Sequence, residues 1–272
     1  MPIHPTASIH PSAQIADDAE IGANVIVKEE CVIGPGCEIM AGAVIGPRTR
    51  MGAGNRVHYY AVIGHEPQFI GFDPSTPSGT RIGDRNEFRE HSFIHRGLKP
   101  GQDTVIGNEC YIMGHGHIAH DCIIGNNVVI ASFCAVAGHV EVGDRAFLSG
   151  NVAIHQFARI GRMAMVGGMT GVSQDIPPFC IAKESLARIY GLNVVGLRRG
   201  GVDQAARKGL QRAFRACLRT SHSPAKGAAA FRAEWGGEPL PGVVEEFLTF
   251  CETKSKRGIT SAVRETAGAS DE

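Results

Sequence analysis

A six-residue period runs through the first two thirds of the chain and limits the folds open to it. Counting in sixes from Ile3 to Ile63 always reaches an apolar residue, and most of these residues are β-branched. After a break, the same phase resumes at Ile106 and continues to Val172. An α-helix turns about every 3.6 residues, so a six-residue spacing would scatter these side chains around its axis. Short β-branched strands joined by a turn every six residues fit the period instead.

Repeats of this kind stack into a solenoid in which each one covers the apolar face of its neighbour. The sequence therefore predicts a parallel β-helix over residues 1–188. Five cysteines share the fifth place of their repeats with several alanines, which predicts small inward-facing residues at a corner: Cys31, Cys37, Cys110, Cys122 and Cys134. No CxxC pair occurs, so neither a zinc ribbon nor a thioredoxin-like motif is indicated. The pattern resembles the left-handed β-helix of hexapeptide-repeat acyltransferases, and that resemblance implies three repeats in each triangular coil.

Two turn-rich insertions interrupt the repeat, at residues 65–79 and 97–104. Insertions in a solenoid leave the core and can line a site on one face. Beyond residue 188 the period becomes helical, with Asp203 expected to cap a helix that runs to Arg219 and a second helix expected from Val243 to Lys254. We therefore expect an all-β solenoid followed by a small helical domain over residues 189–260 and a disordered tail over residues 261–272.

Charge and hydropathy exclude several classes of partner. Lys+Arg and Asp+Glu both number 27, so bulk charge favours neither a nucleic acid nor an anionic membrane. No run approaches the about 18 apolar residues of a membrane-spanning helix, and the first residues lack the features of a signal peptide. The sequence predicts a cytoplasmic protein with no integral membrane segment.

Histidines cluster in the middle of the solenoid. With eighteen residues in a coil, His120 and Gly138 lie on adjacent coils, about 4.8 Å apart, and His139 and His155 lie beside them. A neutral imidazole can take a proton from a hydroxyl group while a backbone N–H stabilises the resulting oxyanion. Glycine lets an acyl group approach the backbone closely. The cluster therefore predicts acyl transfer to a hydroxyl.

Two other functions remain open for the same cluster. The His-x-His-x-x-His spacing of His115, His117 and His120 could hold zinc through neutral imidazoles, as in hexapeptide-repeat carbonic anhydrases, which would make the protein a metal-dependent hydratase. A non-catalytic scaffold would carry the histidines as polar surface. Isolated histidines such as His58 and His91 are expected to be polar surface in any case.

Several runs resemble the UDP-N-acetylglucosamine acyltransferase family: residues 82–86, 94–97, 117–122, 137–139, 154–157, 174–178, 191–193, 196–199 and 256–258. The resemblance covers nearly the whole chain. It implies transfer of a (R)-3-hydroxyacyl chain from acyl carrier protein to the 3-hydroxyl of a UDP-sugar, the first step of lipid A synthesis. It also implies a homotrimer with active sites between subunits, and no metal or other cofactor.

The same resemblance implies roles for individual residues. His120 would be the general base, Asp121 its polarising partner and Gly138 the oxyanion donor. Substrate contacts are implied for a larger set: Gln68, His117, His139, His155, Gln156, Gly168, Asn193 and Arg199. Among these, Gly168 would leave the acyl groove open to a long chain, and Asn193 and Arg199 would hold the nucleotide. Basic residues of the helical domain would receive the acidic carrier protein.

The chain departs from the family pattern where the acceptor is recognised. Residues 67–72 lack the Asp and Lys that are usual in that loop of the family. In the linker, Val195 occupies a position where a Glu is usual, and Gly200 occupies one where an Arg is usual. These departures keep a second acceptor open beside UDP-N-acetylglucosamine, namely a UDP-sugar with an amine at the third carbon.

Overall fold

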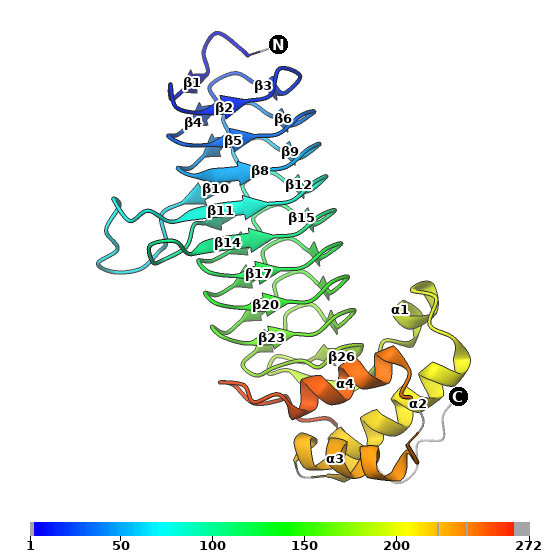
Figure 1. The fold of residues 1–272 in the computed structure, drawn as a ribbon. Helices are drawn as coiled ribbons and strands as arrows, with labels where there is room; N and C mark the ends of the chain where they lie inside the picture. The colour runs from blue at the N-terminus through cyan, green and yellow to red at the C-terminus, as the bar shows by residue number, and fades with distance from the viewer. Residues whose placement is uncertain (1–2, 222, 238, 264–272) are drawn as a thin grey trace.

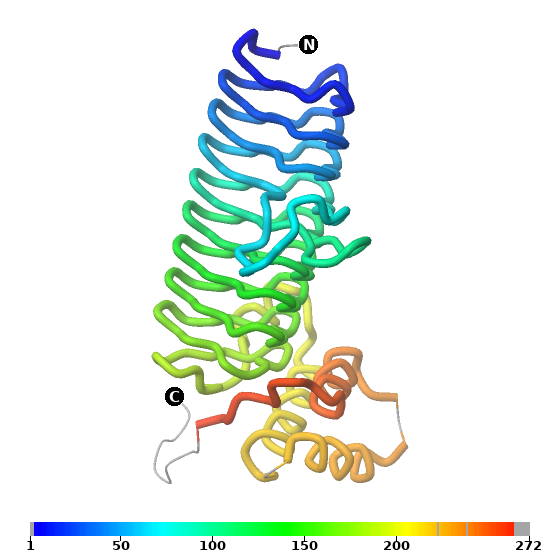
Figure 2. The backbone as a smooth tube through the Cα atoms, turned by 90° about the vertical axis from the view of Figure 1, so that its left-hand side faces the viewer, coloured from blue at the N-terminus to red at the C-terminus, as the bar shows by residue number. Residues whose placement is uncertain are grey.

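The computed structural model describes residues 3–221, 223–237 and 239–263, and these residues form a long solenoid with helices at its C-terminal end (Figures 1 and 2). Three sheets make the sides of the solenoid, with nine, eight and ten strands in the described residues. The strands pair in parallel, except that β26 and β27 are antiparallel. The expected left-handed parallel β-helix is confirmed.

Most strands have only two residues, because a turn follows each apolar step. The first sheet contains β1 (Ser8–Ile9), β4 (Ile26–Val27), β7 (Val44–Ile45), β10 (Val62–His65), β13 (Phe93–His95), β16 (His117–Ile118), β19 (Ala135–Val136), β22 (Ala153–Ile154) and β25 (Gly171–Val172). The second contains β2 (Gln14–Ile15), β5 (Val32–Ile33), β8 (Thr49–Met51), β11 (Gly79–Ile82), β14 (Asp103–Ile106), β17 (Ile123–Ile124), β20 (Glu141–Val142) and β23 (Arg159–Ile160). The third contains β3 (Glu20–Ile21), β6 (Glu38–Ile39), β9 (Arg56–Val57), β12 (Glu87–Phe88), β15 (Tyr111–Ile112), β18 (Val129–Ile130), β21 (Phe147–Leu148), β24 (Met165–Val166), β26 (Cys180–Lys183) and β27 (Arg188–Leu192).

The register between coils follows the predicted repeat. Ser8 pairs with Ile26, eighteen residues later. The spacing is longer only where the insertions add residues, so that Val62 pairs with Phe93 and Phe93 with His117. The insertions lie between β10 and β11 and between β13 and β14, so both leave the solenoid at the corner that joins the first sheet to the second (Figure 2).

The six-step series forms the core of the solenoid. Its members from Ile21 to Val172 are buried, whereas Ile3 and Ile9 at the open N-terminal end are only partly covered. The five cysteines of the repeat are also buried, as predicted. Their thiols donate to carbonyl groups on the following coil, for example Cys122 Sγ to the Ala137 oxygen at 3.1 Å. The corner position therefore favours a small residue that also has a donor.

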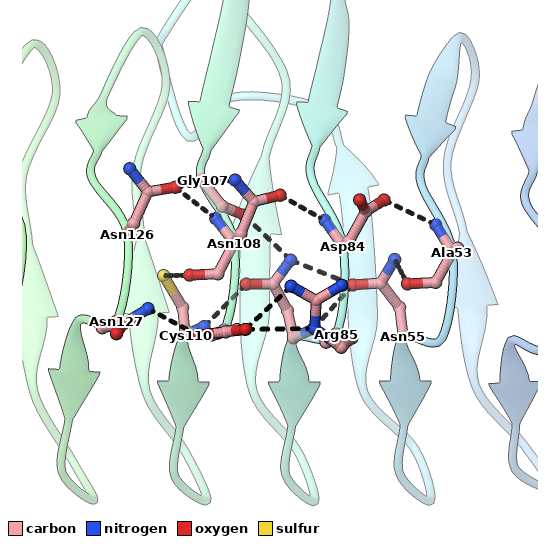
Figure 3. A network of polar contacts seen from close by, with 11 residues as sticks. Ala53, Asn55, Asp84, Arg85, Gly107, Asn108, Cys110, Asn126 and Asn127 are labelled. Carbon is pink, nitrogen blue, oxygen red and sulfur yellow. Dashed lines mark hydrogen bonds and ion pairs between the residues drawn. The ribbon is translucent and has the colours of Figure 1, made fainter.

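A polar ladder follows the corner between the second and third sheets (Figure 3). The Asp84 carboxylate accepts a hydrogen bond from Ala53 N–H, and Asn108 Oδ1 accepts one from Asp84 N–H, each at 2.8 Å. Asn126 Oδ1 accepts from Asn108 N–H at 2.9 Å in the same way. Each side chain thus satisfies a turn amide on the neighbouring coil, so the run at residues 82–86 supports the solenoid itself.

The helical domain contains α1 (Val194–Arg199), α2 (Gln204–Phe214), α3 (Pro224–Glu234), α4 (Gly242–Glu252) and a π-helical stretch at Arg215–Thr220. The Asp203 side chain caps α2 by accepting from Ala206 N–H, as predicted. α4 matches the second expected helix, whereas α1 and α3 were not predicted. α3 is short and rich in Ala and Gly, so its apolar period is weak, although Ser223 followed by a Pro is a helix-start signal. No helix in the described part of the chain has the length and apolar character needed to cross a bilayer.

The chain returns to the solenoid after α4. Ile259 bridges to Asp175 and Ala262 to Ile189, so residues 261–263 pair with the end of the solenoid (Figure 1). The expectation of a disordered tail is therefore wrong for these residues, because backbone pairing holds them, and residues 264–272 lie outside the described part. The third sheet continues through β27 to Leu192, past the expected boundary at residue 188.

Candidate active site

His120 and Asp121 occupy the turn after β16, at the corner where the insertions leave the solenoid. Asp121 has a φ of +59°, and its side chain meets its neighbour, with Oδ2 2.7 Å from His120 Nδ1. The second insertion contributes Leu98 N–H, which lies 3.2 and 3.3 Å from the two carboxylate oxygens. Because Nδ1 is bound to Asp121, Nε2 is the nitrogen of His120 left for a substrate. It forms no hydrogen bond with any described residue.

Competing influences set the ionisation of Asp121. Burial alone would raise the pKa of this carboxyl, but hydrogen bonds from His120 and Leu98 N–H, together with the nearby His139, hold its pKa below the usual value. The group is therefore a carboxylate at neutral pH. A fixed negative charge beside Nδ1 stabilises an imidazolium when Nε2 takes a proton.

Gly138 lies on the next coil, directly against the His120 ring. A Cβ at residue 138 would lie 2.5 Å from His120 Cε1 and 2.7 Å from Nε2. The amides on either side are bonded, Ala137 N–H to the Ile154 oxygen at 3.1 Å and His139 N–H to the His120 oxygen at 3.0 Å. The Gly138 N–H donates to none of the described residues. An unblocked amide donor therefore lies beside the imidazole, as predicted from the coil length.

His139 extends this wall. Its ring meets that of His120 edge-on, with centroids 5.2 Å apart, and its Nε2 lies 3.7 Å from Asp121 Oδ2. Phe157 stacks on its other side at 4.8 Å. Burial lowers the pKa of His139, against the influence of Asp121, and the charges of His120, Lys256 and Lys99 lower it further.

Four more of the predicted residues lie on or beside the corner that carries this wall. His155 and Gln156 occupy the next turn along the same corner, where His155 is exposed and its Nδ1 lies 3.1 Å from the Gln156 carbonyl oxygen. His117, on β16, stacks on Phe93 at 4.5 Å and has a buried Nε2 without a partner among the described residues. Gln68 is exposed in the first insertion, which begins at this corner.

His95 is a buried neighbour of the site that the sequence analysis did not single out. It is 4% exposed and meets His117 edge-on at 4.8 Å. Burial, with the imidazoles of His117, His65 and His120 adding to it, lowers the pKa of His95 to about 4. The sequence could have indicated His95 through its position at the end of β13, the strand that pairs with β16.

The remaining predicted residues lie on other corners. Gly168 is in the turn before β25, at the opposite edge of the first sheet from His120. Asn193 and Arg199 line a cavity of about 190 Å³ with Arg145 at the corner between the second and third sheets. The Asn193 side chain is occupied there, since it accepts from Gly196 N–H at 2.9 Å and donates to the Met163 oxygen at 3.0 Å. Within one chain, the wall around His120, the turn with Gly168 and the cavity with Asn193 and Arg199 therefore lie on three different corners of the solenoid.

A metal ion is a second ligand that this geometry could accept. His120, Asp121 and His139 each offer one ligand atom, and these atoms lie within 4.8 Å of one another. Neutral imidazoles and a carboxylate are ligands that zinc accepts. The zinc hypothesis is therefore open to a direct test with chelators.

Two family profiles match the chain. Residues 175–260 match the family described as UDP N-acetylglucosamine O-acyltransferase, domain 2. Residues 30–65, 103–138 and 121–156 match the bacterial transferase hexapeptide family, described as six repeats. Together these matches include both the solenoid and the helical domain.

Curated relatives carry one activity in their names. The acyl-[acyl-carrier-protein]–UDP-N-acetylglucosamine O-acyltransferase of Syntrophobacter fumaroxidans is 41% identical over 262 residues, which is 95% of this chain and 99% of the relative. A protein of the same name from Campylobacter concisus is 42% identical over 72% of this chain and 76% of its own length.

Solved structures agree with these relatives. LpxA of Acinetobacter baumannii superposes with a TM-score of 0.90 at 33% identity, covering 95% of this chain and 99% of its own. The UDP-N-acetylglucosamine acyltransferase of Campylobacter jejuni gives a TM-score of 0.86 at 36% identity, covering 96% of this chain and all of its own.

Proposed function

This chain belongs to the acyl-[acyl-carrier-protein]–UDP-N-acetylglucosamine O-acyltransferase family, and we propose that the wall around His120 carries out the family's reaction. The protein is an O-acyltransferase that uses acyl carrier protein as donor and UDP-N-acetylglucosamine as acceptor. We further propose that the acyl group is a (R)-3-hydroxyacyl chain, that the 3-hydroxyl receives it, and that the reaction begins lipid A synthesis. One relationship carries the proposal: His120 is bonded through Nδ1 to Asp121, and its ring lies against Gly138, whose N–H donates to none of the described residues.

In the proposed mechanism, His120 Nε2 accepts the proton of the acceptor hydroxyl as its oxygen attacks the thioester carbonyl carbon. Asp121 stabilises the imidazolium that results. The negative charge on the former carbonyl oxygen receives a hydrogen bond from Gly138 N–H. When the tetrahedral intermediate collapses, the C–S bond breaks and the thiolate of the carrier arm takes the proton back from His120. The products are the sugar ester and a free thiol, and no other reactant is needed.

The remaining site residues are proposed as substrate contacts. His117, His139, His155, Gln156 and Gln68 all lie on or beside the corner that carries His120. Their imidazole and amide groups can hydrogen-bond to hydroxyl and acetamido groups of a sugar. His139 is held between Asp121 and Phe157, so its ring is oriented before a substrate arrives.

We propose that the active protein is a homotrimer. Gly168 and the pair Asn193 and Arg199 lie on different corners from His120, so a groove that uses all of them must form between copies. The outer face of the first sheet, between two of these corners, has the small residues Ala135 and Ala153, which lets another solenoid approach closely. Light scattering should report three chains per particle, and a stable monomer at micromolar concentration would overturn the shared site.

The carrier protein is proposed to dock on the helical domain. A cavity of about 520 Å³ is lined by five basic residues of α1, α2 and the π-helical stretch, namely Arg198, Arg207, Lys208, Arg215 and Arg219. Such a surface attracts an acidic partner and should lose this attraction as salt rises. Increasing salt should therefore raise KM for acyl carrier protein more than KM for the sugar nucleotide.

A cytoplasmic location is proposed on the state of the cysteines. All eight are free and buried. Proteins of oxidising compartments commonly use disulfides, whereas cytosolic proteins rarely do.

The test of the proposed function is product formation by the purified protein. It should convert UDP-N-acetylglucosamine and (R)-3-hydroxyacyl carrier protein into a sugar ester that mass spectrometry detects. The corresponding UDP-sugar with a 3-amine is the comparison, because an amide product would be chemically distinct. Turnover of the amine alone, with none of the hydroxyl acceptor, would overturn the proposed acceptor.

A further inference from the structure

A lysine from the C-terminal end of the chain lies at the edge of the catalytic wall. Lys256 Nζ is 3.9 Å from the centre of the Phe157 ring. Phe157 stacks on His139, and His139 meets His120 edge-on, so Lys256 ends an unbroken column of side chains that begins at the proposed base. In the sequence, residues 256–258 show a family resemblance and no sign of a role at the site.

The position of Lys256 is fixed by the chain on one side of it. Arg257 donates through Nε to the Ser173 oxygen at 2.9 Å, and the Gly258 oxygen accepts from Asp175 N–H at 2.8 Å. Ile259 then bridges to Asp175. Residues far apart in sequence are thus paired at the end of the solenoid, and the pairing delivers an exposed ammonium group to the active-site corner.

Lys99 approaches the same wall from the second insertion. It follows Leu98, whose N–H lies 3.2 Å from the Asp121 carboxylate. Lys99 is exposed, and neither it nor Lys256 forms an ion pair with a residue in the described ranges. The charges of both lysines act on His139.

We propose that Lys256 and Lys99 form a phosphate-binding rim beside His139 that holds the diphosphate of the acceptor. This proposal rests on the proposed function, because it takes the UDP-sugar as the ligand. Lysine ammonium groups bind phosphate as point charges. The two lysines bring positive charge to one corner from segments far apart in the sequence.

The acceptor is favoured over the donor as the source of the phosphate. In a UDP-sugar, the diphosphate is attached to the same ring that carries the reacting 3-hydroxyl, so it stays near His120 during the reaction. In the donor, the full pantetheine arm separates the phosphate from the thioester. Only the rings of Phe157 and His139 lie between Lys256 and His120. This short separation fits the distance from the 3-hydroxyl to the diphosphate of a UDP-sugar better than the distance from the thioester to the phosphate of the donor.

The experiment compares Lys256→Gln, Lys99→Gln and the double variant with wild type. Lys254→Gln is the matched control, because it removes an exposed lysine of the same segment that lies outside the column. Steady-state assays measure KM for each substrate and kcat, and calorimetry measures the binding of UDP without turnover. Each single variant should raise KM for the sugar nucleotide and Kd for UDP about tenfold, with kcat and KM for the carrier protein unchanged.

Two outcomes would overturn the proposal. A rise in KM for the carrier protein alone would assign the rim to the donor phosphate. Unchanged KM and Kd values, or a loss in kcat alone, would mean that the lysines do not hold phosphate and act only on the Phe157–His139 column. If wild type does not acylate UDP-N-acetylglucosamine, the proposed function fails, whereas UDP binding still reports on the rim.

Discussion

The His120 ring packs against Gly138 on the adjacent coil with no room for a side chain between them. A Cβ at residue 138 would come within 2.5 Å of Cε1 and 2.7 Å of Nε2. The proposed base therefore lies against the residue whose amide is the proposed oxyanion donor. Because Gly138 has no side chain, the carbonyl carbon of an acyl group could approach both His120 Nε2 and the Gly138 N–H.

The first prediction concerns Gly138→Ala. The added methyl group must displace the His120 ring and cover the amide donor, so kcat should fall at least about 100-fold, the loss typical of removing an oxyanion donor. Circular dichroism should show an intact solenoid. Gly242→Ala is the control, because a Cβ there meets open space. Near-normal kcat in Gly138→Ala would remove Gly138 from the proposed mechanism.

The fold could be predicted from the sequence because its signal is local and repeated. Each six-residue step brings an apolar residue such as Ile112 or Ile130 inward, so one period fixes the register of every coil. The contact of His120 with Gly138 follows from the same register. α3 was not predicted, because its apolar residues have little helical period. The pairing of Ile259 with Asp175 was not predicted either, because it joins two segments far apart in the sequence and neither segment has a pattern that indicates the other.

In the site, only contacts between residues one coil apart, such as His120 and Gly138, could be predicted from the sequence, because the register of the coils determines them. His95 was missed because burial, a property of the folded surroundings, gives it its character. The position of Lys256 over Phe157 depends on how the helical domain returns the chain to the solenoid. Arrangements of this kind depend on tertiary packing, which the period does not encode.

The second prediction concerns acid stability. His95 has a folded-state pKa of about 4 against an ordinary value of 6.5, so the unfolded chain binds more protons between these values. Stability should be full above pH 6.5 and fall as the pH drops towards 4, by up to about 3 kcal/mol from this residue. His95→Gln should flatten the fall of the melting temperature between pH 7 and 5. The exposed His91→Gln should keep the wild-type slope, and equal slopes for all three proteins would contradict the assignment.

The third prediction concerns metal removal. In the proposed mechanism His120 and Asp121 act without a metal, so overnight dialysis against EDTA should leave kcat unchanged. The matching measurement is metal content by mass spectrometry before and after dialysis. A loss of activity that zinc restores would revive the zinc hypothesis, since the ligand atoms of His120, Asp121 and His139 lie within 4.8 Å of one another.

The fourth prediction concerns acyl length. A side chain at Gly168 would first meet the Gly150 oxygen at 3.3 Å, so the native glycine leaves this turn open and a long donor is expected. Each buried methylene contributes about 0.8 kcal/mol, so four of them separate donors by roughly 3 kcal/mol, or over a hundredfold. Gly168→Met should shift preference towards shorter donors when ten- and fourteen-carbon hydroxyacyl carrier proteins compete.

Leu186 is the alternative residue that could limit the length of the acyl chain. It is 65% exposed and bridges to Gly171 on β25, close to the turn that holds Gly168. A wild-type preference for the shorter donor would mean that Leu186, and not Gly168, sets the length of the chain.

The turnover of His120→Ala with UDP-N-acetylglucosamine and (R)-3-hydroxyacyl carrier protein is the decisive measurement. Loss of a general base typically costs about 10²–10⁴-fold in rate, and the imidazole contributes little to the apolar core, so the variant should fold normally and be nearly inactive. His91→Ala, in a turn on another corner, should keep full activity. If His120→Ala retains more than about a tenth of wild-type kcat, His120 is not the base.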